Sequence, residues 1–179
     1  VNFDCNALIE AHMASHADVT VAYKAEPLPI DLIEHRDIGK SLYYTLAIDN
    51  GRVTKMYMNS SEPGMQNISM NIYIIDRELL ISQINTAYVR GQVYFERDIL
   101  APQLERLNVQ AFRYDGYVAR ISSMKSYFNE NMKMLDDVNV DALFSAGNPY
   151  QDSRRQSGPV YQRLKGQQHH GCRRLHHRG

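Results

Sequence analysis

Residues 109–135 carry the clearest pattern of hydrophobic and polar positions in the chain. Residues 109–114 alternate with a period of two, Asp115-Gly116 supplies a turn, and residues 117–121 resume an extended run. Ser122 and Ser123 then offer an N-cap for a helix. The apolar positions of that helix share one stripe: Met124, Tyr127, Phe128, Met132 and Leu135. The pattern by itself predicts a packed strand-and-helix unit.

Patterns typical of strands and patterns typical of helices also follow one another along the rest of the chain, up to about residue 147. Asn50-Gly51, between two alternating runs, is a strong signal for a two-residue hairpin turn. Residues 68–75 are almost continuously apolar, which is typical of a strand buried on both faces. Residues 25–40, with two prolines and several charges, resemble a surface loop.

These patterns predict an α/β fold with one largely buried sheet. We expect strands near residues 19–24, 41–48, 52–58, 68–75 and 109–121. We expect helices at 4–15, 76–90, 96–107 and 123–135, packed on that sheet. Asp4 is the expected N-cap of the first helix, whose buried face carries Leu8, Ala11, His12 and Ser15.

Composition adds few functional clues. The 179 residues suit one domain, and 44% hydrophobic with 22% charged residues is ordinary for a soluble protein. No apolar run approaches the roughly 20 residues that span a bilayer, and no signal pattern is present, so we expect a cytoplasmic protein without membrane contact. Cys5 and Cys172 are far apart in the sequence and do not have the spacing of a disulfide framework or of metal ligands. His12 and His16 lie four positions apart but have no third ligand nearby, so we expect no metal site.

The net charge of zero hides an asymmetry between the two ends of the chain. Residues 150–179 hold six Arg, one Lys and one Asp, so the rest of the chain must be acidic. The tail's composition of Gln, Arg, His and Gly offers too few apolar residues to fold, and we expect residues 148–179 to be disordered. A basic nucleic-acid arm, or a metal tract at His169-His170 and His176-His177, is a possible alternative, but neither has a supporting framework.

Several short motifs resemble the bacterial glucose-1-phosphate adenylyltransferases. Residues 126–135, SYFNENMKML, are similar to the S-Y-W/F-x-A-N-M-x-L-L helix of that family, and residues 69–73, SMNIY, are similar to its S-M-G-I-Y. Residues 95–100, FERDIL, resemble the variant in the regulatory, non-catalytic subunits. The resemblance implies the C-terminal half of a Rossmann-like, three-layer nucleotidyltransferase domain over residues 1–147. If its first strands are missing, the sheet should have an uncovered edge or face.

The resemblance also assigns roles to single residues. It implies that Ser69 and Met70 line a sugar pocket, which the side chain of Asn71 would narrow because the family has glycine there. The family's metal-binding aspartate is Arg120 here, a residue that could instead contact a phosphate or be paired with a carboxylate such as Asp115. The sugar-phosphate lysine of the family's F-x-E-K-P is Asn59 here. The resemblance therefore implies no catalytic residue and no metal ligand in this chain.

The tail has a further interpretation as an out-of-frame segment. Residues 167–179, QQHHGCRRLHHRG, can be back-translated and read one base later as NSIMAADGCIIEG. That string resembles the first turns of the left-handed β-helix domain that follows in the family and would be missing here. We expect the break near residues 147–149.

Taken with the residues, the resemblance implies a fragment of the regulatory subunit of glucose-1-phosphate adenylyltransferase. It would support ADP-glucose synthesis for glycogen biosynthesis beside a catalytic subunit, in a hetero-oligomer such as a tetramer, with Mg²⁺ and ATP bound by that partner and none by this fragment. An active sugar-phosphate nucleotidyltransferase with a divergent site is one alternative. A small nucleic-acid-binding protein with a basic tail is another.

Overall fold

The computed structural model of the chain describes residues 1–29, 32, 43–62 and 64–144. Its helical elements are α1 (Cys5–Ser15), α3 (Arg77–Val89), the π-helical turn η2 (Phe95–Leu100), the 3₁₀ turn η3 (Ala101–Gln103), α4 (Met124–Lys133) and α5 (Asp137–Phe144). Its strands are β1 (Val19–Pro27), β2 (Tyr44–Asp49), β3 (Arg52–Met58), β4 (Met65–Ile75) and β5 (Val109–Arg113). The expectations for the tail, and for most of the loop at 25–40, lie outside these residues.

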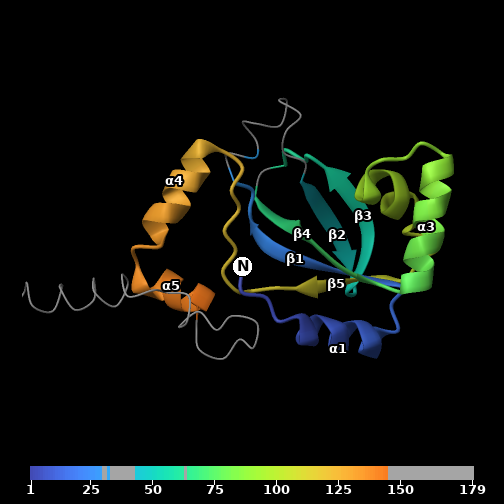
Figure 1. Cartoon of the computed structure of the whole chain (residues 1–179), viewed down its shortest axis with the longest axis horizontal. Coiled ribbons are helices and arrows are strands. Elements are labelled where there is room, and N and C mark those ends of the chain that lie inside the picture. The colour runs from blue at the N-terminus through green and yellow to red at the C-terminus, as the bar shows by residue number, and fades with distance from the viewer. Residues whose placement is uncertain (30–31, 33–42, 63, 145–179) are drawn as a thin grey trace, which may run out of the picture.

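The five strands close into a small barrel in the order β1-β4-β2-β3-β5 (Figure 1). β1 pairs with β4 antiparallel and with β5 parallel, so it is a central strand bonded on both sides. The β1–β4 register shifts between Val21 and Tyr23, and the β2–β3 register shifts between Ala47 and Ile48. Both shifts mark bulges, which increase strand twist and help a short sheet to close. The α/β class is confirmed. The described strands do not form the open, Rossmann-like, three-layer sheet with an uncovered edge that we expected.

The predicted hairpin is confirmed. Asn50 and Gly51, with φ of 49° and 81°, both adopt the left-handed conformation that a two-residue turn of this kind requires. The turn joins β2 to β3, and their register runs from Asp49–Arg52 to Tyr44–Met58. The local sequence signal was sufficient because a tight turn is specified by its own residues.

The main core lies inside the barrel and under the η2–η3 segment. Its buried members come from four strands and this segment: Val19, Val21, Leu46, Val53, Leu100, Leu104 and Val109. The predicted helix over 96–107 is wrong in form, because the chain makes a π-helical turn and then a 3₁₀ turn containing Pro102. Proline lacks an amide hydrogen and clashes with the carbonyl four residues earlier, which prevents a continuous α-helix. The predicted apolar stripe is nevertheless buried at Ile99, Leu100 and Leu104.

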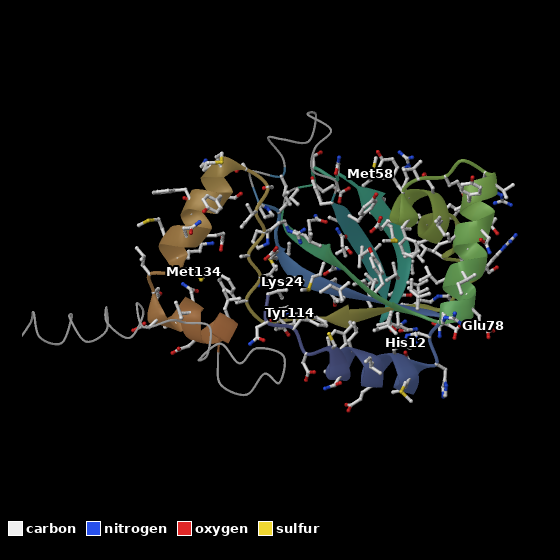
Figure 2. The ribbon with its side chains drawn as sticks, in the orientation of Figure 1. His12, Lys24, Met58, Glu78, Tyr114 and Met134 are labelled. Atoms are coloured by element: carbon white, nitrogen blue, oxygen red, sulfur yellow. The ribbon has the colours of Figure 1, made fainter. Side chains whose placement is uncertain are left out.

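Helix α1 follows its prediction closely. The Asp4 carboxylate accepts a hydrogen bond from the Asn6 amide at 2.9 Å and caps the helix. Leu8 is fully buried, and the His12 Nδ1 lies 2.8 Å from the Thr20 hydroxyl. Figure 2 shows His12 between α1 and the strands, so this histidine has a packing role.

Three predictions about strands and packing are wrong. In β4 only Ile68 and Ser69 are buried, and Asn71 is exposed, so this strand is not buried on both faces. Residues 117–121 form no strand, and α4 does not pack on the sheet: it lies apart from the barrel, on the side away from α3 (Figure 1). The apolar stripe of α4 is exposed, from 50% at Tyr127 to 81% at Met124. Periodicity shows that a helix has an apolar face but does not say what covers that face.

Candidate functional site

The segment between β5 and α4 carries Arg120 and is tied to the barrel by hydrogen bonds. The Tyr114 amide donates to the Tyr23 carbonyl at 2.9 Å, and the Lys24 Nζ donates to the Gly116 carbonyl at 2.8 Å. Lys24 and Tyr114 lie on the side of the barrel that faces α4 (Figure 2). A Cβ at position 116 would lie 2.3 Å from the Tyr114 hydroxyl oxygen, so any residue other than glycine would force the Tyr114 side chain to move. These contacts with the barrel thus fix the path of the segment that carries Arg120.

Arg120 lies against the strand that carries the predicted sugar-pocket residues. Its Nη2 donates to the backbone carbonyl of Ser69 at 3.3 Å, while its Nε is buried without a hydrogen-bond partner among the described residues. The structure therefore brings together Ser69 and Arg120, which are 51 positions apart in the sequence. Among the described residues, the Arg120 guanidinium makes only this one long hydrogen bond, to a neutral carbonyl.

The suggested pairing of Arg120 with Asp115 is wrong. The Asp115 carboxylate is bonded to the Arg113 Nε at 2.8 Å. Burial lowers the pKa of the Arg120 guanidinium, and the negative charge of Glu26 raises it. Because burial is the larger of the two effects, Arg120 is a cation whose lost hydration is incompletely replaced.

Arg120 lines a groove of about 570 Å³ between the end of β1, the 118–122 segment and α4. Three of its lining residues are cations: Arg120, Lys125 and Lys133. Its two carboxylates already face lysines, since Glu130 lies 2.6 Å from the Lys133 Nζ and Glu26 lies 3.9 Å from the Lys24 Nζ. The remaining polar groups on its wall are Ser122, Ser126 and Asn129.

Helix α4 is held over this groove by its own N-terminus and by one tyrosine. The Ser123 hydroxyl accepts from the Ser126 amide at 3.0 Å, and the Ser126 hydroxyl accepts from the Ser123 amide at 2.8 Å, which is a reciprocal capping box. The Tyr117 hydroxyl donates to the Glu130 carboxylate, and burial together with this bond raises the pKa of Tyr117 to about 12. The capping box fixes the start of α4, and the Tyr117–Glu130 hydrogen bond ties α4 to the segment that precedes it.

Sequence reasoning identified Arg120 but missed the lysines of the groove. The available signal was the spacing of Lys125, Asn129 and Lys133 at i, i+4 and i+8, which places them on one face of α4. The apolar stripe beside it dominated the interpretation of the helix. Glu26 gave no signal, because its proximity depends on the β1–β5 pairing.

Ser69 and Met70 lie at the start of a polar network on β4. Ser69 is 1% exposed, and its hydroxyl lies 3.3 Å from the Tyr73 hydroxyl, which donates to Glu96 at 3.0 Å. Met70 is half-buried. Their assignment to a sugar pocket stays a prediction.

A shallow hollow of about 430 Å³ opens beside this network. Its wall includes Asn71 and Tyr73 and is otherwise apolar, completed by Ile75, Leu80 and Phe95. Asn71 has φ of 56°, in the left-handed region where glycine is favoured, and it lies at the position where the family motif has glycine. Asn71 thus lines this hollow, but Ser69 and Met70 do not, and the narrowing of a sugar pocket by Asn71 stays a prediction.

Magnesium, which the family resemblance implies for catalysis, does not fit the residues around Arg120. Mg²⁺ is held by carboxylate and other oxygen ligands, and a guanidinium has no acceptor to offer. In the part of the chain that the structure describes, no three Asp, Glu, His or Cys residues are grouped as metal ligands. Asn59, at the position of the family's phosphate-binding lysine, bonds instead to the backbone of Tyr43 through both its amide (3.0 Å) and its side chain (3.1 Å).

Within the same described ranges, no helix is long and apolar enough to cross a bilayer.

Comparison with known proteins gives similarities to one group of enzymes. No protein-family model matches the chain. The chain is 26% identical over 136 residues to the glucose-1-phosphate adenylyltransferase of Thermomicrobium roseum, which is 75% of this chain and 30% of the relative. It is 24% identical over 144 residues to that of Lachnospira eligens, covering 79% of this chain and 32% of the relative.

A plant protein is similar over a shorter stretch. The glucose-1-phosphate adenylyltransferase large subunit 2 of Hordeum vulgare is 24% identical over 90 residues, which is 50% of this chain and 49% of that relative. The chain thus spans about a third of the length of the two bacterial relatives. These distant, partial similarities support a relationship to the glucose-1-phosphate adenylyltransferases, with the described strands and helices forming an α/β fragment of their domain.

Proposed function

We propose that this chain is part of a regulatory subunit of a glucose-1-phosphate adenylyltransferase and is catalytically silent by itself. It assembles with a catalytic subunit into a hetero-oligomer such as a tetramer. That partner binds Mg²⁺ and ATP and joins ATP to glucose 1-phosphate to make ADP-glucose for glycogen biosynthesis. The distant similarity to adenylyltransferases supports the relationship, and the chemistry at Arg120 supports the silent role.

The observation that carries the proposal is the arginine at position 120. Transfer of an adenylyl group needs a divalent cation to neutralise the phosphates, and carboxylates hold that cation. The guanidinium of Arg120 has the opposite charge, and its groove provides Glu26 and Glu130 only as partners of lysines. A bound Mg²⁺ would be repelled at this position.

Asn59 gives independent support. A desolvated sugar phosphate needs a positive partner, and an amide supplies no charge. Asn59 also has a structural role, because its amide donates to the Tyr43 carbonyl and its side-chain oxygen accepts from the Tyr43 amide. Its φ of 50° is left-handed, a conformation that asparagine tolerates better than most residues. The phosphate of glucose 1-phosphate, the second substrate, therefore also lacks a cation to neutralise it at position 59.

The test uses the natural polypeptide that contains this sequence, purified alone and together with the catalytic subunit from the same source. We expect no magnesium-dependent ADP-glucose synthesis by this polypeptide alone, and a change in the activity of the catalytic subunit when both are present. Arg120→Asp should not restore activity, because Asn59 is unchanged. Arg106→Asp, which makes the same charge change at an exposed position, is the matched control.

Magnesium-dependent synthesis by the unmutated polypeptide alone would overturn the silent role and favour an active enzyme with a divergent site. Failure of the two polypeptides to co-purify, with no effect on activity, would overturn the regulatory role. The first outcome is read from product formation, and the second from co-purification together with the activity of the catalytic subunit.

A further inference from the structure

Helix α3 carries apolar side chains on two sides, and the described chain covers only one of them. On the inner side Ala87 is buried, and Leu79 packs against the main core. Ile84 and Tyr88 follow Leu80 at four and eight positions and continue the apolar surface outward, yet they are 52% and 86% exposed. A surface helix needs one apolar stripe, whereas a helix that is apolar on two sides is typical of one packed between two layers.

The exposed apolar side chains of α3 and of the turn after it form one surface, called here the α3 patch. Its members are Ile81, Ile84, Tyr88, Val89, Val93 and Tyr94. Figure 1 shows α3 at the edge of the molecule, on the opposite side from α4. From the exposed fractions, and from the area that large apolar side chains bury, the patch exposes roughly 500 Å² of apolar surface. The largest apolar patch on a typical monomer is about 300–600 Å², and such patches often mark interaction sites.

The end of the α3 patch is held in place before any partner binds. The Asp98 carboxylate accepts hydrogen bonds from the amides of Val93 and Tyr94 at 3.1 and 3.0 Å. The Arg97 guanidinium lies 4.3 Å from the centre of the Tyr94 ring. A surface that is already ordered loses little conformational entropy when it binds, which favours association.

The charges at the two ends of α3 are complementary to each other. Asp76, Arg77 and Glu78 at the N-terminal end supply two carboxylates and one cation, a net charge of −1, while Arg90 caps the C-terminal end with a charge of +1. Neither Glu78 nor Arg90 makes an ion pair with another residue of the described ranges. Two α3 helices packed antiparallel would bring each acidic end to the basic end of the other, and would also oppose the two helix dipoles.

We propose that the α3 patch binds a second copy of this chain, with the two α3 helices antiparallel about a two-fold axis near Ile84. Both copies use the same surface in such an interface, so every residue contributes twice. The two patches together would bury roughly 1,000 Å², which is the lower limit for a specific interface. The dimer should therefore be weak, with a Kd of about 1 µM to 1 mM. This contact goes beyond the proposed function, in which the partner is a catalytic subunit.

The experiment is sedimentation equilibrium of the 179-residue chain over concentrations that span this Kd. We expect a reversible equilibrium between monomer and dimer. Ile84→Glu should raise the Kd at least about tenfold, because it replaces apolar contact at the axis by two facing carboxylates. Phe128→Ser is the matched control, since it changes an exposed apolar residue of α4, and it should leave the Kd within about twofold of the original.

A charge exchange tests the antiparallel arrangement. Glu78→Arg makes the N-terminal end positive and Arg90→Glu makes the C-terminal end negative, so each alone places like charges together and should raise the Kd at least about threefold. The double variant restores opposite charges and should restore the Kd. Circular dichroism checks that each variant is folded, and Ile84 and Tyr88 are exposed enough that Tyr88→Ser can replace Ile84→Glu.

A chain that stays monomeric at all concentrations, or a dimer whose Kd is unchanged by both Ile84→Glu and Tyr88→Ser, would overturn the interface. A double charge variant that dimerises no more tightly than the single variants would overturn the antiparallel pairing. Because these measurements contain no catalytic subunit and no product formation, their failure would leave the test of the proposed function untouched.

Discussion

The backbone conformation of Asn71 links the motif of residues 69–73 to the hydrogen-bond network beside it. The position has φ of 56°, which explains why glycine suits it and why asparagine is the substitution that a chain tolerates. The Asn71 amide donates to the Ser69 hydroxyl at 3.2 Å, so its turn is part of the network that ends at Glu96. The SMNIY motif thus contains a residue with left-handed backbone inside β4.

Tyr73, in the same network, gives a pH prediction. Burial raises the pKa of its phenol above the ordinary value of 10.0, and the nearby charge of Glu96 raises it further. Above about pH 10 an unfolded chain loses this proton while the folded chain keeps it, so the unfolded state binds fewer protons. The free energy of unfolding must therefore fall as the pH rises through this range, and the contribution is fully present below it.

Tyr73→Phe removes this titration. In urea unfolding experiments between about pH 9 and pH 11, we expect the stability of the variant to fall less steeply than that of the unmutated chain. Tyr88→Phe, at a position that is 86% exposed, is the matched control and should change the slope less. Equal slopes for Tyr73→Phe and the unmutated chain would contradict the assignment.

Helix α4 presents an apolar face to solvent. A polar substitution on this face should therefore raise the solubility of the protein with little change in its free energy of unfolding. Phe128 is 62% exposed, so Phe128→Ser should change the free energy of unfolding by no more than about 0.5 kcal/mol. Leu100→Ala, at a position 2% exposed in the core, should cost about 2–5 kcal/mol. Because exposed apolar patches promote association, Phe128→Ser should also raise solubility. A loss of stability at Phe128 as large as that at Leu100 would show that the stripe is buried.

The elements that the sequence predicted well are those determined by local chemistry. The Asn50-Gly51 turn, the Asp4 cap and the Ser123 cap each depend on residues within one turn of chain. The helix over 96–107 failed because Pro102 interrupts a pattern that remained periodic in its apolar positions. Residues 117–121 failed because an extended run needs a partner strand, and none of the described strands pairs with it.

The arrangement of the whole molecule depended on contacts that no local pattern encodes. Closure of the barrel requires β1 to pair in parallel with β5, 90 positions further along the chain. The groove depends on the same pairing, since it brings Glu26 near Arg120 and α4. Arg120 could be singled out from sequence because its charge is opposite to that of the residue in a resembling motif. The lysines around it could be recognised only after the helix had been placed.

Local stability should differ strongly between the two sides of the molecule. Helices α1 and α4 have similar lengths, 11 and 10 residues, and each has a side-chain N-cap. Helix α1 buries Leu8 completely against the barrel, whereas α4 buries no residue. Full burial of one leucine stabilises by about 1.5–3 kcal/mol, so opening of α1 should cost more than opening of α4 by at least about that amount.

Native-state hydrogen exchange measures this difference directly. We expect the amides of α4 to exchange at least about tenfold faster than those of α1, because 1.4 kcal/mol corresponds to a factor of ten. The amides of β1 are bonded to β4 on one side and β5 on the other, and they should be the slowest to exchange. Equal protection of α1 and α4 would contradict this prediction and would mean that the stripe from Met124 to Leu135 is covered in solution.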